Sequence, residues 1–338
     1  MSIDEADVGI VGAGPGGLYA ATYVGLRGLR AVVLDTLPAP GGQITALYPE
    51  KRIHDVAGFR AVRGRDLVER CTEQAEAAGA RLVLNTRVET LRPDTEGFVL
   101  GTGTGTGAGA QVRCRAVIVA VGLGTFSPRR LPDAERFEGR GVHYVIRDPA
   151  AFRDVDLVIV GGGDAAVDWA LELEDVARSV TLVHRRDRFR AHEGRVEQLL
   201  NSTVQVRTDA EVVHLHGDGE LTGVEVMDKR TDEVQTLPAT RLYGALGFHA
   251  DLGPVSQWPI ALDGRSIPVD RCMRTDLDGV FAAGDITGYE GKLKLISASF
   301  GEAVVAANHA ANHVDPGLRV FPGYGGPRSQ PVAAGTAR

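Results

Sequence analysis

The chain has 338 residues, of which 43% are hydrophobic and 24% charged. These fractions are close to globular averages and exclude a wholly disordered chain, and the length favours two domains. The formal net charge of −7 argues against a nucleic-acid binder steered by its overall charge, and no run of about 18 apolar residues is present that would span a membrane.

Strand and helix signals alternate in the same way twice along the chain. The strand signals lie at residues 6–11, 31–34, 156–160 and 180–183, and the helix signals between them lie at residues 18–26 and 165–173. Each trio predicts a strand–helix–strand unit of a parallel sheet. Two such units predict an α/β fold with two doubly wound, Rossmann-like dinucleotide-binding domains.

Shorter apolar runs, separated by turn residues, fill much of the remaining chain. They predict strands at residues 81–84, 88–91, 98–100 and 117–120, and again at residues 204–207, 212–215, 221–227 and 242–246. Residues 279–285 are typical of a strand that runs into a glycine turn, and residues 296–313 predict an amphipathic helix. Four prolines then predict an extended tail. We expect a discontinuous FAD-binding domain, residues 1–124 and 246–338, with an NADP-binding domain at residues 125–245.

The first predicted strand and helix are joined by a glycine-rich turn, GAGPGG, at residues 12–17. Gly12 permits a tight turn, Gly14 lets a pyrophosphate approach the backbone, and Gly17 lets the helix pack on the strand. The helix N-terminus attracts the phosphates. Asp35 ends the next strand, where a carboxylate can accept ribose hydroxyls. The alternative is an ordinary glycine-rich turn, but strand, helix and acid together favour a dinucleotide site.

A second turn, GGGDAA, opens the second unit in GxGxxA form. Its residues are Gly161, Gly163, Asp164, Ala165 and Ala166, with Gly162 between the first two. The strand that follows ends in arginines rather than in an acid: Arg185, Arg186 and, close behind, Arg190. Guanidinium groups suit phosphate oxygens, so this pattern predicts a 2′-phosphate site and NADP rather than NAD. The alternative is a solvated basic turn.

The three cysteines, Cys71, Cys114 and Cys272, are far apart and match neither a zinc site nor a disulfide framework. The acidic N-terminal residues lack the basic segment of a signal peptide. We therefore expect a cytoplasmic protein with incidental thiols.

Two dinucleotide sites, only one with a 2′-phosphate feature, suggest a flavin beside a nicotinamide. A hydride would pass from one to the other without an acid–base pair.

Several further motifs make a family resemblance recognisable: GGQ at residues 41–43, YPEK at 48–51, DVAGF at 55–59, GGGDAAVDWA at 161–170, FRAHE at 189–193 and AAGD at 282–285. With the glycine turns, they resemble two-dinucleotide flavoprotein reductases, and most closely the thioredoxin-reductase-like ferredoxin (or flavodoxin)–NADP reductases. The resemblance covers residues 6–325. It implies FAD and NADP(H) as cofactors, ferredoxin or flavodoxin as the partner, and a homodimer. The net charge and the lack of a long apolar run argue against a nucleic-acid or membrane partner.

The resemblance also implies roles for individual residues. The FAD pyrophosphate would be held by Gly12, Gly14, Gly16 and Gly17, the adenosine by Asp35 and the backbone of Val88. The flavin side would be contacted by Gln43, Phe126, Asp285 and backbone N–H groups at Leu295 and Ile296. The two faces of the flavin ring would be covered by Tyr48 and by Tyr324, which is followed by Gly325. Ordinary packing of Tyr48, Val88 and Phe126, and a disordered tail, are the alternatives.

One departure separates this sequence from thioredoxin reductase. That enzyme carries a CxxC before its second unit, where this chain has residues 143–148 without cysteine. A dithiol relay needs two thiols within reach of each other, so we do not expect disulfide reduction. The first hypothesis is therefore a ferredoxin–NADP reductase. The alternatives are a related flavoprotein reductase or monooxygenase with another acceptor, and a redox-silent flavin-binding protein.

Overall fold

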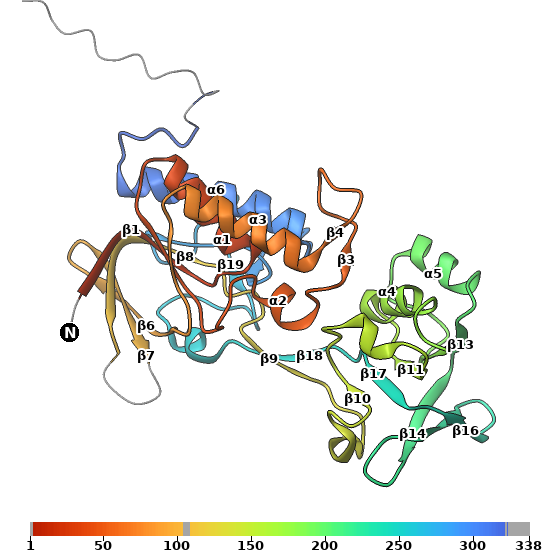
Figure 1. Cartoon of the computed structure of the whole chain (residues 1–338). Coiled ribbons are helices and arrows are strands. Elements are labelled where there is room, and N and C mark those ends of the chain that lie inside the picture. The colour runs from red at the N-terminus through yellow and green to blue at the C-terminus, as the bar shows by residue number, and fades with distance from the viewer. Residues whose placement is uncertain (1–2, 104–108, 322, 324–338) are drawn as a thin grey trace, which may run out of the picture.

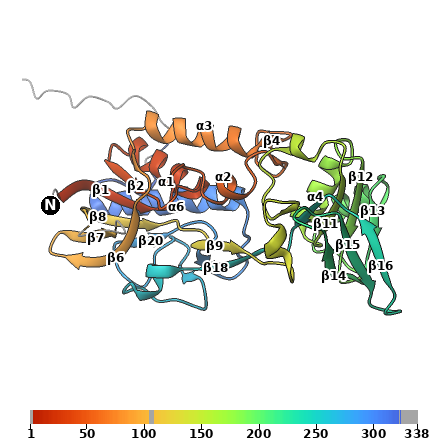
Figure 2. The ribbon, with the colours of Figure 1, turned by 60° about the horizontal axis from the view of Figure 1, so that its bottom comes forward.

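The computed structural model describes residues 3–103, 109–321 and 323. The chain forms two bodies side by side, one built from both ends of the sequence and one from its middle (Figures 1 and 2). Tyr324 and Gly325 lie outside the described residues. Within the described ranges, no helix is both long and apolar enough to cross a bilayer.

The first body is built on a mixed seven-stranded sheet in the order β5-β2-β1-β8-β7-β6, with β20 also paired to β8. Its strands are β1 (Ile3–Val11), β2 (Ala31–Leu34), β5 (Arg81–Val83), β6 (Arg87–Asp94), β7 (Gly97–Gly103), β8 (Gln111–Val119) and β20 (Val280–Ala282). β1 lies at the centre and pairs in parallel with β2 and β8. The carboxyl ends of the parallel strands therefore meet at one edge, where ligands bind in open α/β sheets.

Helices α1 (Pro15–Leu26), α3 (Gly64–Ala77) and α6 (Ile296–Val314) cover one face of this sheet (Figure 2). α1 and α6 meet through small side chains such as Ala21, Ala303 and Ala307, all fully buried. A second buried cluster, including Leu100, Trp258 and residues of β20, lies on the other face. Burial on both faces explains why the parallel strands read as continuous apolar runs.

The second body contains a parallel sheet in the order β10-β17-β11-β12-β13. Its strands are β10 (Val142–His143), β11 (Asp156–Val160), β12 (Ser179–Val183), β13 (Gln205–Arg207) and β17 (Arg241–Gly244). Helices α4 (Asp164–Leu173) and α5 (Glu193–Leu200) belong to this body, as does an antiparallel sheet of β14 (Ala210–His216), β15 (Gly223–Asp228) and β16 (Val234–Pro238). Trp169 on α4 is 1% exposed and anchors the core between α4, α5 and the parallel sheet.

The chain passes between the bodies twice, and the two crossing segments pair with each other. They are β9 (Thr125–Pro128) and β18 (Phe248–Asp251), which run antiparallel (Figure 1). Shorter elements complete the structure: α2 (Gln43–Leu47), β3 (Arg52–Ile53), β4 (Val62–Arg63), β19 (Ile267–Pro268), β21 (Thr287–Gly288), and 3-10 turns at Ala134–Phe137, Pro149–Phe152 and Gly253–Gln257. The predicted two-domain α/β class is confirmed, whereas the exact domain limits stay a prediction.

The predicted strands and helices lie where the structure has them, with ends shifted by a few residues. The last helix runs one residue further than expected, to Val314, before the proline-rich tail. Three helices were not predicted, α2, α3 and α5. α3 nevertheless carries a helical signal, because its buried side chains Leu67, Val68, Cys71 and Ala75 recur at helical spacing.

Candidate functional site

The first glycine turn packs α1 directly against the ends of β1 and β8. Gly12 has a φ of +108°, and a Cβ there would lie 2.4 Å from the carbonyl oxygen of Ala120. A Cβ at Gly17 would lie 1.9 Å from the carbonyl oxygen of Gly12. At Gly14, in contrast, a Cβ would meet nothing within 4 Å. Two glycines thus permit close packing, while Gly14 leaves its backbone open to the adjoining cavity.

A cavity of about 420 Å³ lies in front of this turn, within the size range of cofactor sites. Its lining includes the predicted residues Gly12, Gly14, Gly16, Asp35, Gln43, Tyr48, Val88, Asp285, Leu295 and Ile296. It also includes residues that the sequence did not single out, among them Thr36, Leu37, Val121, Thr125, Val255, Lys294 and Ser299. Gly17 lies behind the turn, and Phe126 lies on β9, opposite Ala250.

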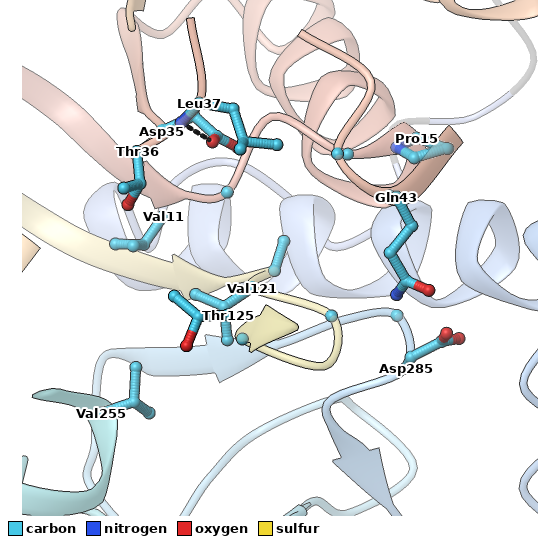
Figure 3. A pocket seen from close by; sticks show the side chains of 18 of the residues that line it. Val11, Pro15, Asp35, Thr36, Leu37, Gln43, Val121, Thr125, Val255 and Asp285 are labelled. Atoms are coloured by element: carbon cyan, nitrogen blue, oxygen red, sulfur yellow. Dashed lines mark hydrogen bonds between the residues drawn. The ribbon is translucent and has the colours of Figure 1, made fainter. Parts of the chain in front are cut away.

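One end of the cavity is built around Asp35, at the end of β2 (Figure 3). Its carboxylate accepts hydrogen bonds from the backbone N–H groups of Ala13, at 2.6 Å, and Leu37, at 2.8 Å. Burial raises the pKa of Asp35, and these two bonds lower it. The carboxylate is therefore fixed beside the glycine turn, and its remaining lone pairs can accept ribose hydroxyls.

The other end of the cavity holds Gln43 and Asp285, which lie across from each other and away from Asp35 (Figure 3). Gln43 opens α2, after Gly42 with a φ of +54°. Tyr48 ends α2, and burial raises its pKa to about 12, with further contributions from the charges of Asp285 and Asp55. Tyr48 thus presents a neutral ring and a hydroxyl donor, suited to contact an aromatic cofactor.

The N-terminus of α6 also faces this end of the cavity. Leu295 caps the helix without any side-chain hydrogen bond, and Leu295 and Ile296 both line the cavity. Free N–H groups and the helix dipole favour negative charge at such a position. Lys294, exposed and beside them, adds a full positive charge. This end can therefore stabilise an electron-rich ring.

A buried carboxylate, Glu302 on α6, holds the AAGD turn behind the cavity. Its Oε2 accepts from the Gly284 backbone N–H at 2.7 Å and from the Thr287 hydroxyl at 3.3 Å. Its Oε1 accepts from the Tyr289 hydroxyl at 2.6 Å and from Lys292 Nζ at 2.5 Å. Glu302 and Lys292 are only 5% and 7% exposed. These four bonds fix the turn that precedes Asp285 and the segment that leads to Lys294.

The second glycine turn lies between β11 and α4. A Cβ at Gly161 would lie 2.5 Å from the carbonyl oxygen of Ala245, and one at Gly162 would meet the His184 ring at 2.1 Å. Asp164 opens α4 and accepts a hydrogen bond from the backbone N–H of His192, at 3.0 Å. Ala165 and Ala166 follow in the first helical turn.

The predicted arginines lie beside this second turn. The backbone N–H of Arg190 donates to the carbonyl of Gly162 at 2.6 Å, so the arginine loop returns to the glycines. Arg185, Arg186 and Arg190 are exposed, and across the described ranges their guanidinium groups form no ion pair. A Cβ at Gly163 would meet nothing within 4 Å, so the backbone is open there, and together with the unpaired guanidiniums it fits a dinucleotide that carries a 2′-phosphate.

The donor groups at the first turn fit FAD. The backbone is open at Gly14, a fixed carboxylate lies at one end, and a neutral aromatic ring with a helix N-terminus lies at the other. Over the described part of the chain, no group of His, Cys, Asp and Glu side chains is arranged to hold a metal ion.

Comparisons with known proteins agree with this geometry. The pyridine nucleotide-disulphide oxidoreductase family matches residues 6–310. A ferredoxin–NADP reductase of Salinispora arenicola is 50% identical over 95% of this chain and 98% of its own length. One of Thermus thermophilus is 45% identical over 98% and 99%. Among solved structures, Lactococcus lactis thioredoxin reductase in its FR conformation superposes with a TM-score of 0.79, at 27% identity, over 91% of this chain and 99% of that one.

The packing at the first turn predicts the effect of one added methyl group. Gly17→Ala places a Cβ 1.9 Å from the Gly12 carbonyl, so α1 must move and the purified protein should lose most of its bound FAD, measured by absorbance at 450 nm. Gly301→Ala, at an exposed position of α6, is the control, because its Cβ meets nothing within 4 Å, and it should keep FAD and gain up to about 1 kcal/mol. Full FAD content in Gly17→Ala would contradict this packing.

The Glu302 network predicts a graded loss of stability. Glu302→Ala leaves the Lys292 ammonium group buried without a partner, which should cost about 3–5 kcal/mol and release FAD. Glu302→Gln keeps one of the two acceptor oxygens, so its loss should be smaller. The measurement is thermal unfolding with flavin fluorescence. Equal losses for Ala and Gln would show that hydrogen bonding at Glu302 does not hold the turn.

Proposed function

This chain belongs to the pyridine nucleotide-disulphide oxidoreductase family, and from that membership we propose that it transfers electrons between NADPH and ferredoxin or flavodoxin as a ferredoxin–NADP reductase. The resemblance drawn from the sequence is confirmed by these relatives, as are the predictions of an oxidoreductase and of FAD and NADP(H) as its cofactors. The identity of the electron acceptor is the part that we propose.

The observation that carries this proposal is the presence of two intact dinucleotide turns in a chain without a dithiol. Burial raises the pKa of Cys71 to about 11 and that of Cys114 to about 12, so both thiols stay protonated. Cys272 is the third free cysteine. A disulfide relay requires a reactive thiolate with a second thiol nearby. An external one-electron carrier is therefore the acceptor that this chain favours.

The residues of the first body would perform three tasks. Gly12, Gly14, Gly16 and the N-terminus of α1 would hold the pyrophosphate of FAD, and Asp35 its adenosine ribose. Bound FAD would accept the hydride of NADPH and allow the two electrons to leave one at a time. Gln43, Asp285 and the N-terminus of α6 would orient the flavin end and stabilise negative charge there. We also propose that Val88 and Phe126 contact FAD.

The residues that cover the ring are assigned on different grounds. Tyr48 lines the flavin end of the cavity, so we propose that it covers one face of the ring. Tyr324 and Gly325, on the other face, are proposed from the family resemblance alone. The NADP site would use Gly161, Gly163, Asp164, Ala165 and Ala166 for the pyrophosphate, with Arg185, Arg186 and Arg190 for the 2′-phosphate. A homodimer is proposed on the same resemblance.

Anaerobic reduction tests the proposed function. NADPH should bleach the flavin of the purified holoenzyme, and cytochrome c should then be reduced only when a ferredoxin or flavodoxin is added. Absence of bleaching would contradict the proposal and favour a redox-silent protein. Equal reduction of cytochrome c with and without the carrier would also contradict it, as would rapid reduction of a disulfide substrate.

The arginine loop predicts a preference for NADPH. Arg185→Ala with Arg186→Ala should raise KM for NADPH at least about tenfold, because charge-assisted hydrogen bonds are worth about 1.5–3 kcal/mol each. KM for NADH should change little, since NADH lacks the 2′-phosphate. Arg153→Ala, another exposed arginine of the same body, serves as the control. An equal loss with both nucleotides would show that these arginines do not contact the 2′-phosphate.

The acidic character that we expect of ferredoxin predicts salt-sensitive docking despite the net charge of −7. In the described part of the chain, Arg60 and Arg63 form no ion pair, whereas Arg65 pairs with Glu50 and Arg130 with two glutamates. Arg60→Ser with Arg63→Ser should therefore raise KM for ferredoxin about two- to tenfold and flatten its salt dependence.

A second pair of neighbouring arginines, Arg129 and Arg130, provides the matched control, since Arg129→Ser with Arg130→Ser removes the same charge. Steady-state rates with ferredoxin from 20 to about 300 mM salt distinguish the two pairs. A KM that is flat over this range in the unmodified enzyme would contradict electrostatic docking.

A further inference from the structure

Two charged residues of the sequence motifs have no role in the sites described above, Lys51 of YPEK at residues 48–51 and Asp168 of α4. The structure brings them together. Lys51 Nζ lies 2.7 Å from Asp168 Oδ2, and the two side chains are only 17% and 15% exposed. Lys51 belongs to the first body and Asp168 to the second, and both ribbon views place the segment around β3 and β4 beside α4 (Figures 1 and 2). This ion pair therefore joins the two bodies.

The contact continues into the second body. Asp168 Oδ1 accepts a hydrogen bond from Arg195 Nε at 2.9 Å, and Arg195 lies on α5, which follows the arginine loop. Glu172 lies one helical turn beyond Asp168. Burial raises the pKa of Glu172, while the charges of Arg52, Lys51 and Arg195 lower it. Acids of the second body thus meet bases of the first, and Asp168 keeps a partner within its own body.

The ion pair lies close in sequence to both cofactor sites. Lys51 is three residues after Tyr48, which lines the flavin end of the cavity. Asp168 is four residues, about one helical turn, after Asp164, which opens α4 at the second glycine turn. Hydride transfer requires the reacting atoms about 3–3.5 Å apart in the correct orientation. The chain connects the two bodies through only two short strands, β9 and β18, which hold the relative orientation of the bodies less precisely than this distance requires.

We propose that Lys51 and Asp168 are positioning residues, whose ion pair holds the second body in the orientation in which NADPH reduces the flavin. The inference rests on the proposed function for its first half-reaction only, the reduction by NADPH. Neither residue lines the cavity of the first body. They act through Tyr48 on one side and through α4, with its glycine turn, on the other.

The experiment uses the full holoenzyme and stopped-flow reduction by NADPH without oxygen. Lys51→Met removes the charge but leaves Asp168 paired with Arg195, so the second body should fold normally. The limiting rate of flavin reduction should fall at least fivefold, while the dissociation constant for NADP⁺ stays within twofold. Lys51→Arg retains the charge and should stay within twofold of the unmodified enzyme. Arg113→Met, which breaks an ion pair within the first body, should change nothing.

Two further measurements separate positioning from general damage. Asp168→Asn combined with Lys51→Met should be no slower than Lys51→Met alone, because both remove the same contact. Small-angle X-ray scattering of Lys51→Met should differ from that of the unmodified enzyme and of Lys51→Arg. An unchanged or faster reduction rate in Lys51→Met, an equally slow Lys51→Arg, or additive losses would each overturn the inference.

The two proposals fail in different ways. If NADPH does not reduce the unmodified enzyme, the proposed function is wrong. If the unmodified enzyme is reduced and passes electrons to ferredoxin, but Lys51→Met behaves like it, only the role of the ion pair is wrong.

Discussion

The close packing of a helix against the ends of two strands is the constraint on which both dinucleotide sites depend. In the first body it requires hydrogen atoms in place of side chains at Gly12 and Gly17. In the second body a Cβ at Gly161 would clash with the Ala245 carbonyl, and one at Gly162 would clash with the His184 ring. Only this proximity aims the N-terminal N–H groups of α1 and α4 at the ends of the sheets, where a pyrophosphate can meet them.

This constraint explains why the sites were predictable from local sequence. A turn of fixed spacing, a strand before it and a helix after it all lie within about 30 residues, and the residue that selects the nucleotide lies at the end of the following strand. Asp35 and the Arg185–Arg186 pair follow β2 and β12 as this rule requires. The strands themselves were recognisable because burial on both faces makes them continuous apolar runs.

The parts that could not be predicted depend on residues far apart in the sequence. Glu302 holds Gly284 from 18 positions away, and Lys51 meets Asp168 across the boundary between the two bodies. A charged residue reads as solvent-exposed in a single sequence, so a 5% exposed Glu302 gives no signal of its own. α3 is a different case, since its buried apolar residues recur at a helical spacing that the sequence alone displays.

The likeness to thioredoxin reductase shows how little of the chemistry the fold determines. The two chains share their fold at a TM-score of 0.79 and 27% identity, and a shared fold can serve different chemistry. The stretch at residues 143–148 of this chain follows the start of β10 and contains no cysteine, and its side chains Tyr144 and Ile146 are buried in the second body. With Cys71 and Cys114 enclosed in the first body, the chain offers electrons no covalent route out of the flavin. The proposed external carrier would then approach the exposed surface beside this end of the cavity, where Lys294 meets solvent.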